Sequence, residues 1–198
     1  IKAALDFPHD PQRYRVVTFL PDGYIGNDQQ IIGEVQNRVG AARVFSFGVG
    51  SSPNRYLLER MAKLGRGTAG FLGLNDSGAE VMDLYFERIS HPAMTDLDIN
   101  WGGMQVSDMY PKKLPDLFVG RPVIITGKFT GDATAIKVNG RAGTQGIAMD
   151  IAPDVDDTHK AVAKVWARMR IADMVDQQTW DHAKRDELAQ SIFATAME

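Results

Sequence analysis

The residue with the clearest chemical potential is Asp22, an aspartate just beyond the apolar run Val16 to Leu20 and directly before Gly23. An apolar run of this length that stops at turn-forming residues is typical of a buried strand in a parallel sheet. Open α/β sheets bind ligands at the carboxyl ends of their strands. A carboxylate there could hold a cation, although Asp-Gly is also a common turn pair. We expect Asp22 to point outward from the carboxyl edge of the sheet.

Other kinds of chemistry find little support in the sequence. The four histidines form no His-Glu-x-x-His motif, and no serine stands in a Gly-x-Ser-x-Gly elbow. Gly48-Val49-Gly50 follows a strand-like run but lacks the third glycine of a dinucleotide-binding loop, so close packing explains these glycines better. The chain has no cysteine, which excludes disulfides, zinc thiolates and thiol catalysis. We therefore expect a protein that is not an enzyme.

The composition is that of an ordinary globular chain. Of 198 residues, 44% are hydrophobic and 24% are charged, and 22 basic against 25 acidic side chains give a net charge of −3. No basic block favours nucleic acid, and no apolar run approaches the roughly 20 residues of a membrane helix. The absence of cysteine favours a bacterial source. Both ends resemble cut helices, so the lack of a signal peptide says little.

The elements that must position Asp22 alternate between strand and helix. Strand-like runs cover residues 16–20, 42–50 and 68–74, and helix-like segments cover 29–39, 55–64 and 76–89. This alternation predicts parallel strands with right-handed crossovers. Asn54 is the expected N-cap of the second of these helices.

The pattern changes after Pro92. Strand-like runs follow at 94–101, 122–129, 133–138 and 146–151, and Asn139-Gly140 predicts a hairpin turn. The proline-rich stretch 106–120 is unsuited to an interior strand. Helical sequence begins near residue 157, and Asp156, Asp157 and Thr158 are expected to cap it rather than to bind calcium. Val162, Val165 and Trp166 of this helix are expected to face inward. We expect a partial Rossmann-like α/β domain over 1–91, a β-rich extension over 92–154 and a helical segment over 155–198.

The prolines and aromatic residues of the stretch Asp108 to Gly120 have no generic structural explanation. Other distinctive stretches are Val17 to Asp28, Arg43 to Gly50, Asn54 to Leu58 and Ile89 to Leu97. Together they resemble the C-terminal part of a von Willebrand factor A domain, of the type found in inter-α-trypsin inhibitor heavy chains and in bacterial relatives with a VIT domain. The resemblance implies a Rossmann-like α/β fold and a non-catalytic role in protein binding and adhesion.

In this family a divalent cation, usually Mg²⁺, occupies a metal-ion-dependent adhesion site (MIDAS). The resemblance implies that Asp22 is a metal ligand, with Gly23, Tyr24 and Asn27 in the binding segment beside it. The family's first two metal loops have no counterpart in this sequence, and Pro21 stands where threonine is common. We therefore expect an incomplete site, with no metal bound to this chain and Mg²⁺ bound by the full-length protein.

The resemblance further implies a protein or extracellular-matrix ligand and an exported, cell-envelope or secreted location, without a nucleic-acid partner. A domain of this kind without its first strands would leave one sheet edge unpaired, so we expect the chain to form a homodimer. Two alternatives stay open. One is a structural scaffold in which Asp22 binds no metal, and the other is a chelatase-like component associated with an ATPase.

Overall fold

The computed structural model describes residues 1–10, 13–21, 25–156, 158–179 and 181–197. The chain divides into two compact units. Unit 1 comprises Ile1–Thr95, Pro115–Pro122 and Arg141–Gln145, and unit 2 comprises Asp96–Leu114, Val123–Gly140 and Gly146–Glu198. Each unit is therefore assembled from separate stretches of the sequence.

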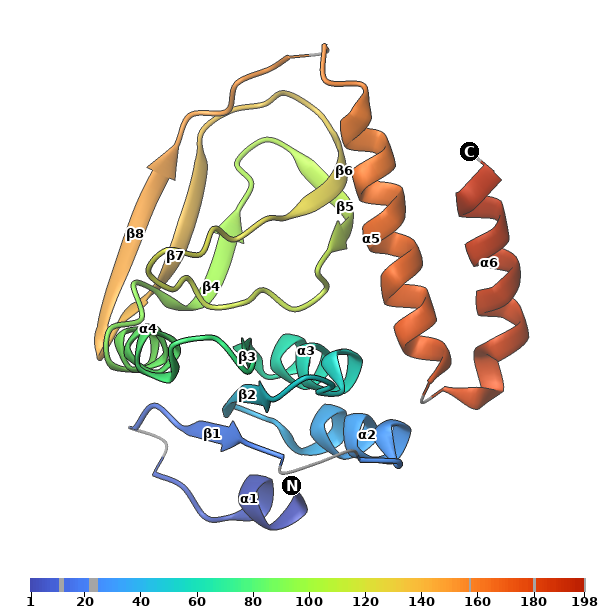
Figure 1. The fold of residues 1–198 in the computed structure, drawn as a ribbon. Coiled ribbons are helices and arrows are strands. Elements are labelled where there is room, and N and C mark those ends of the chain that lie inside the picture. Colours follow the sequence, from blue (N-terminus) through green and yellow to red (C-terminus); the bar gives the residue numbers. More distant parts are fainter. Residues whose placement is uncertain (11–12, 22–24, 157, 180, 198) are drawn as a thin grey trace. The chain divides into compact units, whose positions relative to one another are not determined.

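Unit 1 is built on a parallel three-stranded sheet with the order β1-β2-β3 (Figure 1). Its strands are β1 (Val16–Phe19), β2 (Arg43–Val49) and β3 (Arg66–Leu72), and its helices are α1 (Lys2–Asp6), α2 (Asp28–Arg38), α3 (Arg55–Leu64) and α4 (Gly78–Ser90). Strand and helix alternate from β1 to α4. The predicted α/β class with a parallel sheet is therefore confirmed, and α3 has the predicted bounds.

Both faces of β2 are buried because helices cover the sheet on each side. Phe45 and Phe47 pack against Tyr85 of α4, whose ring centroid lies 5.5 and 4.9 Å from theirs. On the other face, the hydroxyl of Ser46 donates to the carbonyl of Leu58 in α3 at 2.6 Å. Since successive side chains of a strand point to opposite faces, β2 forms the centre of a helix–sheet–helix arrangement.

The first strand is less buried than its sequence predicts. Thr18 is exposed and Leu20, just beyond the strand, is 59% exposed. Among the described strands, β1 pairs only with β2, so its outer edge has no neighbouring strand. The apolar run therefore belongs to an edge strand, and the prediction of a fully buried strand is wrong.

The segment Pro115–Pro122, from the proline-rich stretch, belongs to unit 1. Phe118 is buried and packs edge-on against Phe45, with ring centroids 5.6 Å apart. Asp116 is also buried and accepts two hydrogen bonds from Arg43, the first residue of β2. This part of the proline-rich stretch therefore has a structural role, because it completes the hydrophobic core on one face of the sheet.

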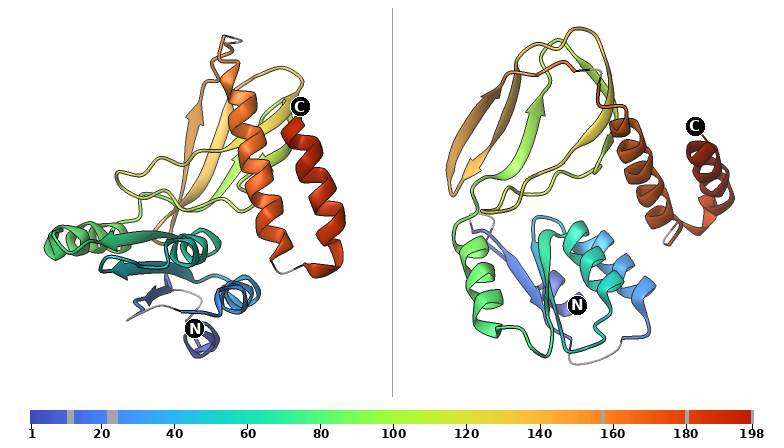
Figure 2. Two further views of the ribbon diagram at one scale, coloured as in Figure 1. Left: turned by 45° about the vertical axis from the view of Figure 1, so that its right-hand side comes forward. Right: turned by 45° about the horizontal axis from the view of Figure 1, so that its top comes forward.

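Most of the remaining strands and the C-terminal helices belong to unit 2. They are β4 (Thr95–Asn100), β5 (Gln105–Tyr110), β6 (Thr126–Thr130), β7 (Ile136–Ala142), β8 (Gln145–Ile151), α5 (Ala161–Gln178), η1 (His182–Lys184) and α6 (Arg185–Met197). One sheet has the order β4-β7-β8, and β5 pairs antiparallel with β6. The helices α5 and α6 lie side by side (Figure 2). The predicted β-rich segment and helical tail are both present.

One prediction about the strands of this part is wrong, and another agrees with the structure. Asn139-Gly140 lies inside β7, and the turn falls at Gly143-Thr144, where Gly143 has a φ of 60°. The stretch 106–120 contains most of strand β5, which ends before Pro111. Among the described strands β5 pairs only with β6, so the prolines interrupt no interior strand.

The start and the inner face of α5 also differ from the prediction. Asp156 caps no helix, because its carboxylate accepts hydrogen bonds from the backbone N–H and the hydroxyl of Thr158 while α5 begins at Ala161. Val162 and Val165, predicted to face inward, are 56% and 44% exposed, whereas Trp166 is buried as predicted. Apolar periodicity locates this helix but not its buried face.

Candidate functional site

The carboxyl edge of the unit 1 sheet, where its strands end in loops, is the place at which the sequence predicts a ligand. β1 ends at Phe19, and Asp22, Gly23 and Tyr24 lie outside the described residues. Their roles in metal and ligand binding therefore stay predictions. Asn27, the fourth predicted site residue, is described and exposed.

Asn27 occupies the N-cap position of α2, but its side chain does not cap the helix. Its amide donates instead to the side-chain oxygen of Gln30 at 3.2 Å. An exposed side chain that has this one hydrogen bond among the described residues can turn toward a ligand. The structure therefore leaves the predicted binding role of Asn27 open.

Next to Asn27 lies a carboxylate that the sequence analysis did not select, Asp28. Nδ2 of Asn54 donates to Oδ2 of Asp28 at 2.8 Å and so joins the start of α3 to the start of α2. Oδ1 of Asn54 accepts the backbone N–H of Leu57 at 3.1 Å, which confirms Asn54 as the cap of α3. Because both ends of the amide are engaged, the orientation of Asn54 is well defined.

The other carboxylate oxygen of Asp28 is the unusual atom of this edge. Oδ1 is buried and has no hydrogen-bond partner among the described residues. A buried acceptor without a donor costs free energy, and it is suited to accept an N–H or a hydroxyl or to face a cation. The loops after adjacent parallel strands bring Asp28 and Asn54 together. The signal for this contact in the sequence was a polar residue at the start of each helix, Asp28 for α2 and Asn54 for α3.

The described residues do not fit a complete metal site on their own. Within the described ranges, no three histidine, cysteine or acidic side chains gather closely enough to hold a metal ion. Magnesium takes roughly six oxygen ligands in near-octahedral geometry. Asp28 and Asn54 supply too few ligands for such a site.

Of the two glycines at the end of β2, Gly48 is explained by packing, as the sequence predicts, whereas Gly50 has open space around it and a φ of 98°. A Cβ atom on Gly48 would lie 2.5 Å from the Cβ of Pro53 and 2.8 Å from a methyl carbon of Leu58. Only glycine therefore fits where α3 and the loop before it approach the strand. The histidines are all exposed, in agreement with their predicted solvent-facing positions; they are His9, His91, His159 and His182.

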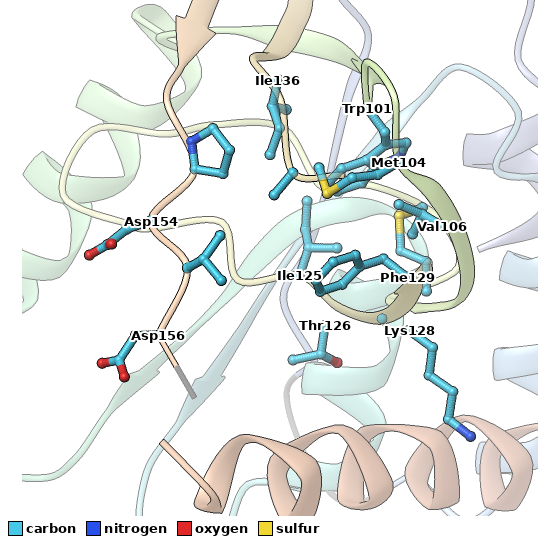
Figure 3. Close-up of a pocket in the computed structure, with 15 residues that line it drawn as sticks. Trp101, Met104, Val106, Ile125, Thr126, Lys128, Phe129, Ile136, Asp154 and Asp156 are labelled. Atoms are coloured by element: carbon cyan, nitrogen blue, oxygen red, sulfur yellow. The ribbon is translucent and has the colours of Figure 1, made fainter. Parts of the chain in front are cut away.

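A second candidate is a cavity of about 300 Å³ in unit 2, shown in Figure 3. Apolar side chains line it, among them Trp101, Met104 and Phe129. The carboxylates of Asp154 and Asp156 point away from these side chains. Hydrogen bonds from Thr158 also hold the pKa of Asp156 below its usual range. This cavity can take a small apolar group, but neither carboxylate is placed to select one.

Comparison with known proteins finds von Willebrand factor A domain-containing proteins and an inter-alpha-trypsin inhibitor heavy chain. No protein-family model matches the chain. A von Willebrand factor A domain-containing protein of Dictyostelium discoideum is 25% identical over 169 residues, which cover 82% of this chain and 8% of that protein. Inter-alpha-trypsin inhibitor heavy chain H2 of Sus scrofa is 22% identical over 189 residues, which cover 86% of this chain and 20% of that protein.

Among solved structures, the ArnB paralog VWA2 from Sulfolobus acidocaldarius matches 92% of this chain and 55% of its own chain, with 15% identity and a TM-score of 0.42. The curated relatives confirm the resemblance to the von Willebrand factor A domain that the sequence motifs carry. The chain spans a fifth or less of the length of these two relatives. No helix in the described part of the chain combines the length and the apolar character that a membrane span needs.

Proposed function

We propose that this chain, a relative of von Willebrand factor A domain proteins, is part of a non-catalytic module that binds another protein. The ligand binds at the carboxyl edge of the β1-β2-β3 sheet, where Asp28 and Asn54 meet. The observation that carries this proposal is the buried Oδ1 of Asp28, which has no hydrogen-bond partner among the described residues. The free-energy cost of this unpaired oxygen is removed when a ligand brings a hydrogen-bond donor or a cation to it.

For the intact protein the proposal extends to metal-dependent adhesion of the MIDAS type. Asp22 is one ligand of a Mg²⁺ ion, and Gly23, Tyr24 and Asn27 lie in the segment that meets the partner. Support comes from the similarity of residues 17–28 to the metal loop of the family and from the oxygen donors at the same edge. The partner is a protein or a matrix component, and the intact protein is exported, secreted or part of the cell envelope.

Calorimetric titration with MgCl₂ tests the metal site. This chain and the intact protein are titrated side by side, each also as Asp22→Ala. The matched control is Asp132→Ala, which removes an exposed carboxylate from unit 2. We expect heat only from the intact protein, lost in Asp22→Ala and retained in Asp132→Ala. Equal heats in all forms would overturn metal-dependent adhesion.

A structural scaffold is the second function that an observation favours. The described residues form no complete metal site. Asp116 and Phe118 of the proline-rich stretch are buried and complete the core of unit 1. Failure of the folded intact protein to bind Mg²⁺ would favour the scaffold. The chelatase-like alternative has less support, because Gly48 is explained by packing and forms part of no phosphate loop.

We also propose that this chain forms a homodimer through the outer edge of β1. A groove of about 810 Å³ beside the strand is lined by Phe7, Tyr14 and Val16, among others, and Phe7 is 70% exposed. An unpaired strand edge beside exposed apolar side chains favours pairing with a second chain. Light scattering is expected to show a dimer at high protein concentration, and a monomer over the whole range would contradict this.

A further inference from the structure

A positively charged cavity of about 530 Å³ lies in unit 1 beside β3. Among the described strands, β3 pairs only with β2, so its outer edge has no neighbouring strand. Residues of β3, α3 and α4 line the cavity together with Arg121. Its charged side chains are three cations, Lys63, Arg88 and Arg121, and one carboxylate, Glu59. The cavity is therefore suited to an anionic group.

Two of these cations have no acidic partner among the described residues. Nη1 of Arg88 donates to the hydroxyl of Thr68 at the long distance of 3.5 Å, and its Nε is buried with no hydrogen-bond partner in the described part of the chain. Nη1 of Arg121 donates to the backbone carbonyl of Gly67, in β3, at 3.1 Å. Each guanidinium therefore keeps further N–H donors for a ligand, because an arginine carries five.

The two guanidinium groups also repel each other. Burial lowers the pKa of Arg121, and the charge of Arg88 lowers it further. A carboxylate placed between the two arginines would pair with their remaining N–H groups and remove this repulsion. A guanidinium matches a carboxylate with two parallel hydrogen bonds, which makes such contacts both strong and selective.

We propose that this cavity binds a glutamate or aspartate side chain of an extended acidic segment of a partner protein, and that the segment pairs with the outer edge of β3 along residues 69–72, beyond the carbonyl of Gly67 that Arg121 occupies. Exposed sheet edges bind extended peptide segments in this way. Hydrogen bonds between the two backbones provide the affinity, and pockets for the side chains of the segment provide the specificity. Phe71 lines the same cavity, with the guanidinium of Arg55 4.1 Å from its ring centroid, and offers an apolar surface to an adjacent side chain. This interaction is separate from metal binding near Asp22 and goes beyond the function proposed above.

A fluorescein-labelled peptide of alternating glutamate and valine tests the proposal by fluorescence anisotropy. EDTA is present, so divalent cations cannot contribute. We expect the double variant Arg88→Gln with Arg121→Gln to bind about tenfold more weakly or worse, because charge-assisted hydrogen bonds are lost. The matched control, Arg141→Gln with Arg168→Gln, removes two exposed arginines elsewhere and should bind like the wild type.

Equal binding by the three proteins, or binding by none of them, would overturn the proposal. Inorganic phosphate is the second probe. If phosphate alone binds as tightly as the peptide and with the same dependence on Arg88, the cavity is a general anion site and the acidic segment is excluded. The same peptide with glutamine in place of glutamate should bind more weakly, and equal binding would contradict charge recognition.

Hydrogen exchange tests the pairing with the strand edge. The bound peptide should protect backbone amides of β3, and binding without such protection would overturn the edge pairing. If circular dichroism shows that the double variant is unfolded, the single variant Arg121→Gln replaces it and should weaken binding severalfold. Peptide binding without Mg²⁺ binding by the intact protein would reject metal-dependent adhesion and retain this inference.

Discussion

Arg43 and Asp116 form a buried ion pair between residues 73 positions apart in the sequence. Nε and Nη2 of Arg43 donate to the two carboxylate oxygens of Asp116 at 2.6 and 2.9 Å, and Nη1 donates to the carbonyl of Ala41. The hydroxyl of Tyr14 donates to Asp116 as well, at 3.1 Å. The two charged side chains are 4% and 1% exposed, so water contributes little to the stabilisation of either charge.

Replacement of Asp116 by alanine should strongly destabilise unit 1. The guanidinium of Arg43 stays buried while it loses the carboxylate of Asp116, and breaking a buried ion pair costs about 3–5 kcal/mol. Urea unfolding followed by circular dichroism measures the loss. Asp6→Ala is the control, because it breaks an exposed pair with Arg38 and should change the stability little. Similar losses in the two variants would show that burial of the pair is unimportant.

Stability at alkaline pH should depend on Tyr14. Partial burial raises the pKa of Tyr14, which is 37% exposed, and the nearby charge of Asp116 raises it further. The folded protein therefore holds the phenolic proton more tightly than the unfolded chain. This contribution is complete below the ordinary tyrosine pKa of about 10 and is lost as the pH rises above it.

Tyr14→Phe should consequently lose less stability than the wild type between about pH 9 and about pH 11. Urea midpoints measured across this range test the difference. Tyr56→Phe changes a tyrosine that is 49% exposed and should follow the wild type. If the stability of the wild type and of Tyr14→Phe changed in parallel with pH, Tyr14 would not be the source of the alkaline loss of stability.

Two asparagines that precede helices should respond differently to alanine. Asn54→Ala removes both the cap of α3 and the partner of Asp28, and we expect a loss of about 1–2 kcal/mol in the free energy of unfolding. Asn27→Ala removes a side chain that caps nothing and should cost less than about 0.5 kcal/mol. Chemical denaturation measures both variants, and the reverse order would contradict the proposed arrangement of this edge.

In unit 2, Trp166 should be the principal anchor of α5. Its Nε1 donates to the carbonyl of Asp108 at 2.9 Å, and its ring centroid lies 6.3 Å from that of Tyr110. Trp166→Ala should cost about 3–5 kcal/mol, as for other large core truncations. Hydrogen exchange of the α5 amides reports the loss. Val162→Ala, at a position 56% exposed on the same helix, should leave the exchange nearly unchanged.

The elements of unit 1 were predictable because local sequence determines them. The bounds of α3 follow from its apolar spacing and from Asn54 at its start, and β2 follows from its apolar run. The burial of β1 was not predictable, because it depends on which strands lie beside it. At Asn139-Gly140 the local turn preference gave the wrong answer, because these residues pair within a sheet.

The candidate site was predictable only in part for a similar reason. The capping role of Asn54 follows from its residue type and its place before a helix. Its contact with Asp28 joins residues 26 positions apart and exists only because two helices start at the same sheet edge. The partner of Asp116 was likewise hidden, since no local pattern connects a proline-rich stretch to the first residue of a strand.

The interleaving of the two units has a consequence for how the chain is made. Unit 1 needs Pro115–Pro122, but the chain first passes through Asp96–Leu114, which belongs to unit 2. On the ribosome, Phe45 and Phe47 are therefore synthesised long before Phe118 emerges to cover them. Incomplete domains with exposed apolar surface tend to aggregate. Nascent chains that stall shortly after Thr95 should thus be prime clients of cellular chaperones.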